Sequence, residues 1–339
     1  MKKLYSIQYV RGVAAVAVVL FHASQRTGAH AFTVGAAGVD IFFVISGFIM
    51  WVISQERPVS PVAFMKDRII RIAPIYWLAS AVMVAGALAG LFPNLVLTGE
   101  HVLASFAFIP ARSPSNGQVW PVLAQGWTLN YEMAFYAVFA VSLALASGRR
   151  LFLLAAVFGG LVLARAISGG GWFFLDFYGR PVVLEFVAGA VIGKLWLSGA
   201  RLGVGASWCV VVLSITGFGC VNRGLLPYDV AVLGPCAVLI VAGMASLESA
   251  GHMPVSPALA YIGDASYSIY LWHSLAVSIV ARAGGLLHLG ASAQMILCVI
   301  GGTLVGIAGY EILERPLTRA LRRVFRRPSK AAARRAQNA

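Results

Sequence analysis

Two ionisable residues in the first long apolar stretch carry the clearest chemical signal of this sequence. Arg11 and His22 stand eleven positions apart within residues 7–23. In an α-helix eleven residues make about three turns, so the two side chains share one face, roughly 16 Å apart along the axis. Ionisable groups in a membrane-spanning helix usually face a bundle interior or a wet cavity. The pair therefore predicts the wall of a reaction chamber, with a cation near the cytosolic face and an imidazole near the far face.

The composition places this chemistry in a membrane. Of the 339 residues, 60% are hydrophobic and 11% are charged, and the mean hydropathy is +0.84. A soluble domain carries about 25% charged residues because its surface faces water. We therefore expect an all-α, polytopic integral membrane protein.

Apolar runs near the length of about 20 residues that crosses a bilayer occur about ten times. The expected transmembrane helices are residues 6–23, 37–54, 73–91, 119–146, 151–168, 181–197, 203–221, 230–247, 266–283 and 292–313. Residues 100–110 are apolar but too short to cross, so we expect them to be re-entrant or interfacial. The sequence thus predicts one membrane-embedded domain, residues 1–316, followed by a basic, disordered cytosolic tail, residues 317–339.

Lysine and arginine are distributed unevenly around these spans. With a cytosolic N-terminus, most of the 26 Lys and Arg residues fall on the cytosolic side, which predicts that both termini lie in the cytosol. The net charge of +14 has its largest part in the tail, where we expect contact with anionic lipid headgroups. The tail has a single aromatic residue, Phe325, and no recognisable nucleic-acid module, so we expect no nucleic-acid partner.

A carboxylate opens the second span. Asp40 stands in the segment GVDIFFVISGF, near the expected outer boundary of the membrane. A carboxylate there is suited to hold the His22 imidazole in one tautomer and to raise its basicity, as the orienting acid of a catalytic triad does. The alternative interpretation is a helix cap at the interface.

A basic group precedes the third span. Lys66 is followed by the RIIR segment, whose Arg68 and Arg71 are three positions apart and project from one side of a helix. Two guanidiniums on that side suit a phosphate-rich ligand that approaches from the cytosol. The alternative is that they set the topology and contact headgroups.

Further polar residues interrupt later spans. Glu132, in WTLNYEMAFY, is the only carboxylate of a strongly apolar helix, so it must be paired, protonated or reached by water, and Glu185 raises the same question. In SYSIYLWH, Tyr270 suits an interfacial aromatic belt, while His273 lies deeper and is more often a hydrogen-bonded structural group. The cysteines lack metal-ligand spacing, and no metal site is expected.

In this order the segments resemble the acyltransferase-3 family of membrane-bound acyltransferases, in particular its bacterial exopolysaccharide-modifying branch. The resemblance covers residues 7–316 and rests on Arg11 with His22, GVDIFFVISGF, the RIIR pair, WTLNYEMAFY, SYSIYLWH and the terminal ERP. The sequence departs from the family at Met133, where a second acidic residue commonly stands. It departs again after His273, which is followed by Ser274 and Leu275, whereas family members often have proline directly after the histidine. Neither departure touches the proposed catalytic pair.

The resemblance implies transfer of an acyl group, usually acetyl, from cytosolic acyl-CoA to a carbohydrate hydroxyl at the bacterial inner membrane, with no bound cofactor. His22 would act as general base and Asp40 would orient it. Arg11 would stabilise developing negative charge or the incoming thioester. The set expected to bind the CoA phosphates is Lys66, Arg68 and Arg71.

Several alternatives stay open at this point. An acyl-His22 intermediate is as compatible with the sequence as direct transfer. A transporter or flippase for glycans or lipid-linked sugars would also need buried charges along its path. A third possibility is a scaffold subunit of a polysaccharide-export complex, and such export machinery is an expected partner in any case.

Overall fold

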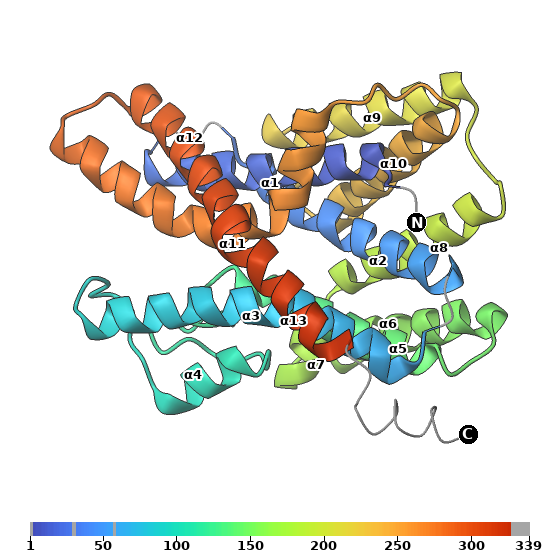
Figure 1. The fold of residues 1–339 in the computed structure, drawn as a ribbon, viewed down its shortest axis with the longest axis horizontal. Helices are drawn as coiled ribbons and strands as arrows, with labels where there is room; N and C mark the ends of the chain where they lie inside the picture. The colour runs from blue at the N-terminus through green and yellow to red at the C-terminus, as the bar shows by residue number, and fades with distance from the viewer. Residues whose placement is uncertain (1–2, 29–31, 57–58, 327–339) are drawn as a thin grey trace.

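The computed structural model describes residues 3–28, 32–56 and 59–326, and the regular elements in these ranges are all helices (Figure 1). Eight helical segments of the described chain are long and apolar enough to cross a membrane. They are α1 (Tyr5–Arg26), α2 (Gly38–Glu56) with the preceding 3-10 turn, α3 (Pro61–Leu88), α6 (Ser147–Ser168), α9 (Val204–Asn222), α10 (Val230–Ser249), α11 (Pro257–Leu286) and α12 (Ala291–Gly309), which continues into α13. This confirms the expected all-α, multi-pass membrane fold.

Two of the ten expected spans are shorter than a full crossing. α5 (Gly126–Ser142) has 17 residues and α8 (Leu184–Leu197) has 14. Residues 119–125, expected at the start of the fourth span, form a loop tied to the short helix α4 (Gly99–Phe106). The Ser105 hydroxyl accepts the Val122 amide at 2.9 Å, and His101 Nε2 lies 2.8 Å from the Trp120 carbonyl oxygen. Eight long helices and two short ones therefore occupy the ten expected places.

The helices form two groups joined by α2 and α8. In Figure 1, α1 and α9 to α12 lie in the upper half, and α3 to α7, which includes α7 (Phe173–Tyr178), lie in the lower half. The most extensive pairings join α1 with α11, α11 with α12, α2 with α8, and α9 with α10. In its most apolar stretch α2 is 72% buried and α6 only 11%. α2 is thus a central helix, while α6 presents most of its apolar surface to lipid.

Glycines let the central helices approach closely. A Cβ added to Gly189 of α8 would lie 1.9 Å from the carbonyl oxygen of Val44 in α2. A Cβ added to Gly263 of α11 would lie 2.1 Å from the carbonyl oxygen of Gln8 in α1. Small residues allow this backbone-to-backbone packing in membranes. The two crossings place the polar residues of α2 beside α8 and those of α1 beside α11.

The third span begins earlier than expected. Ser60 caps α3 by accepting the Ala63 amide at 3.2 Å, and Pro61 occupies the first turn. The basic group from Lys66 to Arg71 therefore lies inside α3, in its first half, and not in a connecting loop.

The start of the basic tail is helical, which differs from the expected disorder of residues 317–326. A π-helical turn, Tyr310–Glu314, leads into α13 (Arg315–Arg326). α13 packs on α3, where Arg322 Nη2 lies 3.3 Å from Asp67 Oδ1 and Lys66 Nζ lies 4.4 Å from the centre of the Phe325 ring. These contacts fix a segment that sequence alone leaves without a partner. The rest of the expected disordered tail, residues 327–339, lies outside the described residues.

Candidate active site

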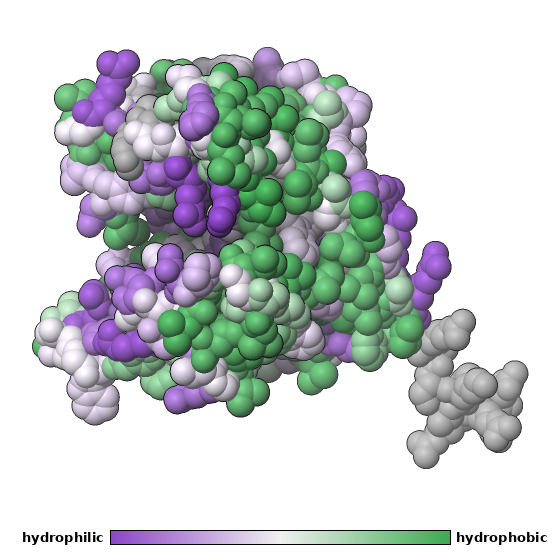
Figure 2. Space-filling model, turned by 90° about the vertical axis from the view of Figure 1, so that its left-hand side faces the viewer, coloured by the Kyte–Doolittle hydropathy of each residue, from purple (hydrophilic) through white to green (hydrophobic). Residues whose placement is uncertain are grey.

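A large cavity opens at the end of the molecule where α1 ends. Its volume is about 1910 Å³, and Figure 2 shows the corresponding face hollowed between two halves, with hydrophilic side chains around the opening. His22, Asp40 and Tyr270 all line it. Its wall also carries aromatic, amide and charged side chains, among them Trp120, Trp127, Gln125, Arg165, Arg180 and Asp229. We call this space the outer cavity.

His22 meets a second histidine at the wall of the outer cavity. The ring centroids of His22 and His273 are 5.0 Å apart. His273 is completely buried, and its Nδ1 lies 3.0 Å from the carbonyl oxygen of Ile269, one turn earlier in α11. The sequence pattern singled out both histidines but gave no reason to place them together.

Asp40 does not hold His22 in this structure. No hydrogen bond joins the two side chains, and the Asp40 carboxyl lies instead beside that of Glu185 in α8. No salt bridge among the described residues includes either carboxyl group. The close α2–α8 crossing explains the pairing, because it carries Asp40 toward α8. The loop residue Tyr228 lies near both carboxyl groups. Burial raises the pKa of its phenol to about 12, and the negative charges of Asp40 and Glu185 add to that effect.

A second polar group, the inner cluster, surrounds Arg11. The charged residues that act on its guanidinium are Arg71, Glu314, Asp264 and Glu132. Two hydroxyl groups hold Glu132 in place. Ser46 donates a hydrogen bond of 2.9 Å to its carboxylate, and Tyr136 donates a second one. Glu314 accepts a hydrogen bond of 2.7 Å from Ser268. Glu132 is therefore paired through hydroxyl donors, one of the outcomes that its apolar helix required.

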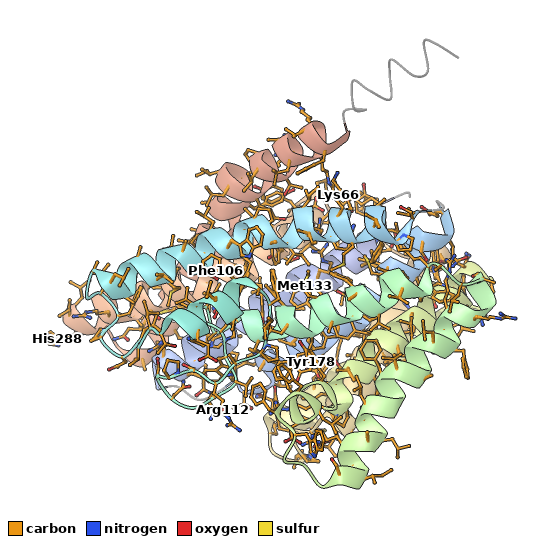
Figure 3. All side chains as sticks on the ribbon, turned by 90° about the horizontal axis from the view of Figure 1, so that it is seen from below. Lys66, Phe106, Arg112, Met133, Tyr178 and His288 are labelled. Atoms are coloured by element: carbon orange, nitrogen blue, oxygen red, sulfur yellow. The ribbon has the colours of Figure 1, made fainter. Side chains whose placement is uncertain are left out.

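The three residues expected to bind the CoA phosphates, Lys66, Arg68 and Arg71, lie in different surroundings. Arg71 belongs to the inner cluster. Arg68 is buried, pairs with Asp67, and has its guanidinium 5.8 Å from the centre of the Phe64 ring. Lys66 is exposed at the α13 contact, and Figure 3 shows it at one end of the molecule, away from Arg112 and His288.

The outer cavity and the inner cluster are not continuous in this structure. Among the described residues, the lining of the outer cavity includes neither Arg11 nor Arg68 nor Arg71, so the cavity does not reach the inner cluster. Tyr270 stands at the boundary: its ring is 6.0 Å from that of Phe42, and its hydroxyl donates to the Gln125 carbonyl oxygen at 3.2 Å. Tyr270 is thus a buried side chain of the cavity wall as well as a member of an aromatic motif.

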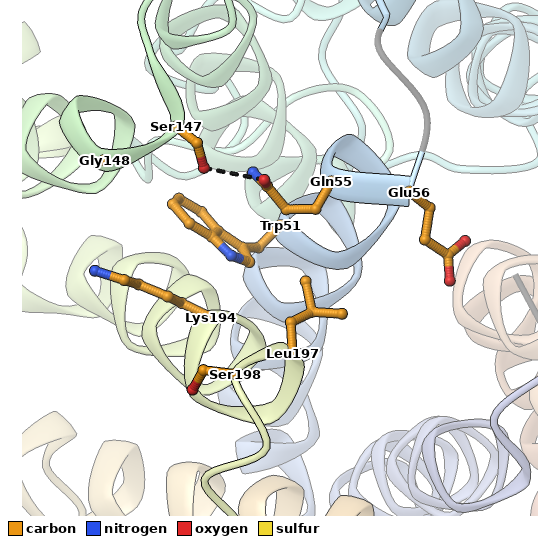
Figure 4. A pocket seen from close by; sticks show the side chains of 8 residues that line it. All are labelled: Trp51, Gln55, Glu56, Ser147, Gly148, Lys194, Leu197 and Ser198. Carbon is orange, nitrogen blue, oxygen red and sulfur yellow. Dashed lines mark hydrogen bonds between the residues drawn. The ribbon is translucent and has the colours of Figure 1, made fainter.

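A smaller pocket of about 330 Å³ lies where α2, α6 and α8 meet (Figure 4). Trp51 and Lys194 line it, and Ser147 donates a 3.0 Å hydrogen bond to the Gln55 side chain at its edge. It contains none of the residues that the sequence pattern singled out. The outer cavity is therefore the better candidate for the reaction site.

Comparison with known proteins settles the family. The model of the acyltransferase domain that defines the acyltransferase-3 family matches residues 4–311, nearly the whole chain. The chain belongs to the acyltransferase-3 family. It is therefore a multi-pass membrane acyltransferase, and this membership favours the enzyme over the transporter and scaffold alternatives.

Relatives of this acyltransferase come from several bacteria. The chain is 56% identical over 301 residues to the exopolysaccharide production protein ExoZ of Rhizobium meliloti (strain 1021), which covers 89% of this chain and 95% of the relative. It is 28% identical to the putative membrane-bound transacylase BcsY of Komagataeibacter xylinus, over 91% of this chain and 81% of the relative. It is 26% identical to nodulation protein 10 of Rhizobium leguminosarum bv. viciae, over 83% and 82%. No solved structure matches the chain.

Sequence reasoning missed several polar residues of the acyltransferase cavity, among them Gln125. Gln125 lines the outer cavity, is buried, and its side-chain nitrogen has no hydrogen-bond partner among the described residues. It directly precedes α5 and the WTLNYEMAFY motif, so its place beside the motif was the available signal. An amide donor without a partner, in a residue of the cavity wall, is suited to bind an oxygen of a ligand.

Proposed function

We propose that this acyltransferase moves an acyl group, acetyl in the first instance, from cytosolic acyl-CoA to a hydroxyl of an exopolysaccharide or a lipid-linked precursor outside the bacterial inner membrane. The observation that carries the proposal is His22 on the wall of the outer cavity. The high identity to a protein named for exopolysaccharide production supports a carbohydrate acceptor. The basic α13 and the tail after it would contact anionic headgroups on the cytosolic side, and polysaccharide-export machinery would be the partner that consumes the product.

The outer cavity has the size and lining for a carbohydrate. Small-molecule pockets commonly measure about 300–1,000 Å³, and this cavity is larger, at about 1910 Å³. Trp120 and Trp127 offer flat apolar faces to sugar rings, while Asp40 and Gln125 offer an acceptor and a donor to hydroxyl groups. An oligosaccharide segment fits this description better than a single small metabolite does.

The donor would approach from the other membrane face. Met83, which lines the outer cavity, stands seventeen residues after Lys66 in α3, so the two are roughly 26 Å apart along the helix. That distance approaches the thickness of the hydrocarbon core, about 30 Å. Lys66, Arg68 and Arg71 would contact the CoA phosphates, and the pantetheine arm would extend toward His22.

Arg11 serves the donor in this arrangement. It is three turns from His22 in the unbroken helix α1, which is roughly 16 Å. From there its guanidinium cannot reach an oxyanion that forms beside His22. It lies instead in the inner cluster with Arg71, on the path of the incoming thioester.

The chemical step needs one base and one oxyanion donor. His22 takes the proton of the acceptor hydroxyl as the hydroxyl oxygen bonds to the thioester carbonyl carbon. The carbonyl electron pair moves onto its oxygen, to which the Gln125 amide would donate a hydrogen bond. Collapse of this intermediate breaks the carbon–sulfur bond, and the proton on His22 passes to the departing CoA sulfur. The Tyr270–Phe42 boundary must open before the thioester can arrive.

Sealed membrane vesicles of known orientation test this proposal. We expect inside-out vesicles supplied with radiolabelled acetyl-CoA to transfer label to a glycan on their inner side, whereas right-side-out vesicles do not respond to external acetyl-CoA. A flippase would move the glycan, but no label would appear on the glycan in either kind of vesicle. Absence of transfer from acetyl-CoA and from longer acyl-CoA donors, in vesicles that contain the acceptor, would contradict the proposal.

A further inference from the structure

Two imidazole rings from distant parts of the chain meet at the outer cavity. The ring planes of His22 and His273 are inclined by 38°, with centroids 5.0 Å apart. His22 is partly buried and lines the cavity, whereas His273 is completely buried and does not line it. Seen from the cavity, His273 therefore lies behind His22.

The hydrogen bonding of His273 fixes which of its nitrogens carries the proton. Nδ1 lies 3.0 Å from the carbonyl oxygen of Ile269. A carbonyl oxygen only accepts, so Nδ1 is the donor, and Nε2 of the neutral ring is left as an acceptor. Nε2 is buried without a hydrogen-bond partner among the described residues. A buried acceptor without a donor costs about 1–3 kcal/mol. We therefore expect a hydrogen-bond donor close to Nε2 of His273.

The surroundings of the pair leave His22 as that donor. The ring of Tyr270 is 6.1 Å from His273, but its hydroxyl already bonds to the Gln125 carbonyl oxygen and lies 3.0 Å from Thr128 Oγ1. The charged group that acts on His22 is Arg26, which cannot accept a hydrogen bond. From α12, the backbone of Gly302 packs against the His273 side chain. Among the described residues, no carboxylate acts on either ring.

We infer that His273 is a positioning residue: its Nε2 accepts a hydrogen bond from one ring N–H of His22 and thereby holds His22 in a single tautomer. The other nitrogen of His22 then presents its lone pair to the outer cavity. This inference rests on the proposed function, and it gives His273 the orienting part that a carboxylate plays in a triad. His273 also stabilises the imidazolium form of His22 after proton transfer, because its acceptor nitrogen faces the positive ring.

The tautomer of His22 can be observed directly. In membranes that contain the protein labelled with nitrogen-15 histidine, we expect the ring nitrogens of His22 to show one tautomer, with the signals of the six histidines assigned through single substitutions. His273→Leu fills the volume but removes the acceptor, and we expect both tautomers of His22. His273→Gln retains a side-chain oxygen, and we expect one tautomer again. His252→Gln replaces an exposed histidine and is the matched control.

Turnover provides the second readout. We expect kcat to fall about 100-fold in His273→Leu, the scale of a general-base contribution, with donor and acceptor KM unchanged. His273→Gln should recover to within about tenfold of the native rate, and His252→Gln should match the native protein. If His273 were merely structural, both variants would lose kcat to the same extent, and the loss would follow their fall in thermal stability.

The outcomes separate this inference from the proposed function. A single His22 tautomer in His273→Leu, with His22→Ala inactive, would overturn the positioning role and leave the base assignment standing. Full transfer by His22→Ala would overturn the base assignment itself. The nitrogen signals do not depend on activity, so the first result is readable even where turnover is too slow to measure.

Discussion

The close crossing of α2 and α8 gives a stability prediction with a built-in control. Gly47 of α2 faces α8, where an added Cβ would lie 2.0 Å from the carbonyl oxygen of Phe186. Ordinary contact begins at 3.4 Å, so Gly47→Ala must force the two backbones apart by about 1.4 Å. A gap of 0.5–1 Å already forfeits about a quarter to a half of the dispersion energy at a contact. The stacked rings of Phe43 and Phe186, with centroids 4.4 Å apart, lie in the same interface.

We expect Gly47→Ala to destabilise the protein by about 1–3 kcal/mol, the usual cost of overpacking. Gly159→Ala, in α6, is the matched control because nothing lies within 4 Å of the added Cβ. At position 159 alanine favours the helix more than glycine does, so the substitution should be neutral or stabilising by up to about 1 kcal/mol. Thermal unfolding of both variants in the same detergent measures the difference. Equal melting temperatures for the two variants would refute the close packing of α2 on α8.

Three further substitutions test the donor end of the proposed path, its acceptor end and the stability of the inner cluster. Arg71→Ala should raise the KM for acyl-CoA about tenfold, the effect of losing about 1.4 kcal/mol of binding, and leave the acceptor KM unchanged. Exposed Arg112 is its control, and an equal effect of Arg112→Ala in initial-rate assays would count against a specific donor site. Arg180→Ala, at the outer cavity, should raise the acceptor KM alone, and an altered donor KM would reverse its assignment. Glu132→Gln keeps an oxygen for its two hydroxyl donors but loses the charge, so we expect a loss of about 1–2 kcal/mol in thermal unfolding. Unchanged stability would mean that the negative charge of Glu132 does not stabilise the fold.

The part of the fold that depends on local sequence was predictable. Apolar runs near 20 residues long marked the places of the helices, and the eleven-residue spacing of Arg11 and His22 put both on one face of α1. The start of α5 was not predictable from hydropathy, because residues 119–125 are apolar yet are held in a loop by hydrogen bonds to α4.

The partners of the site residues depended on packing between distant segments. Asp40 was expected beside His22 because both lie near the outer boundary. The α2–α8 crossing instead brings Asp40 to Glu185, and the α1–α11 crossing brings His273 to His22. Glycines at both crossings were visible in the sequence, but a glycine does not reveal which helix it faces. That choice is made by the three-dimensional fit of whole helices.

The most direct test of the account is acylation of the polymer by cells that carry His22→Ala. Mass spectrometry of the exopolysaccharide should show the acyl group lost, while the variant is inserted in the membrane at the native amount and melts at the native temperature. Restoring the native chain should restore the modification. A polymer acylated to the native extent by the His22→Ala protein, in cells without another enzyme for that position, would contradict the central claim.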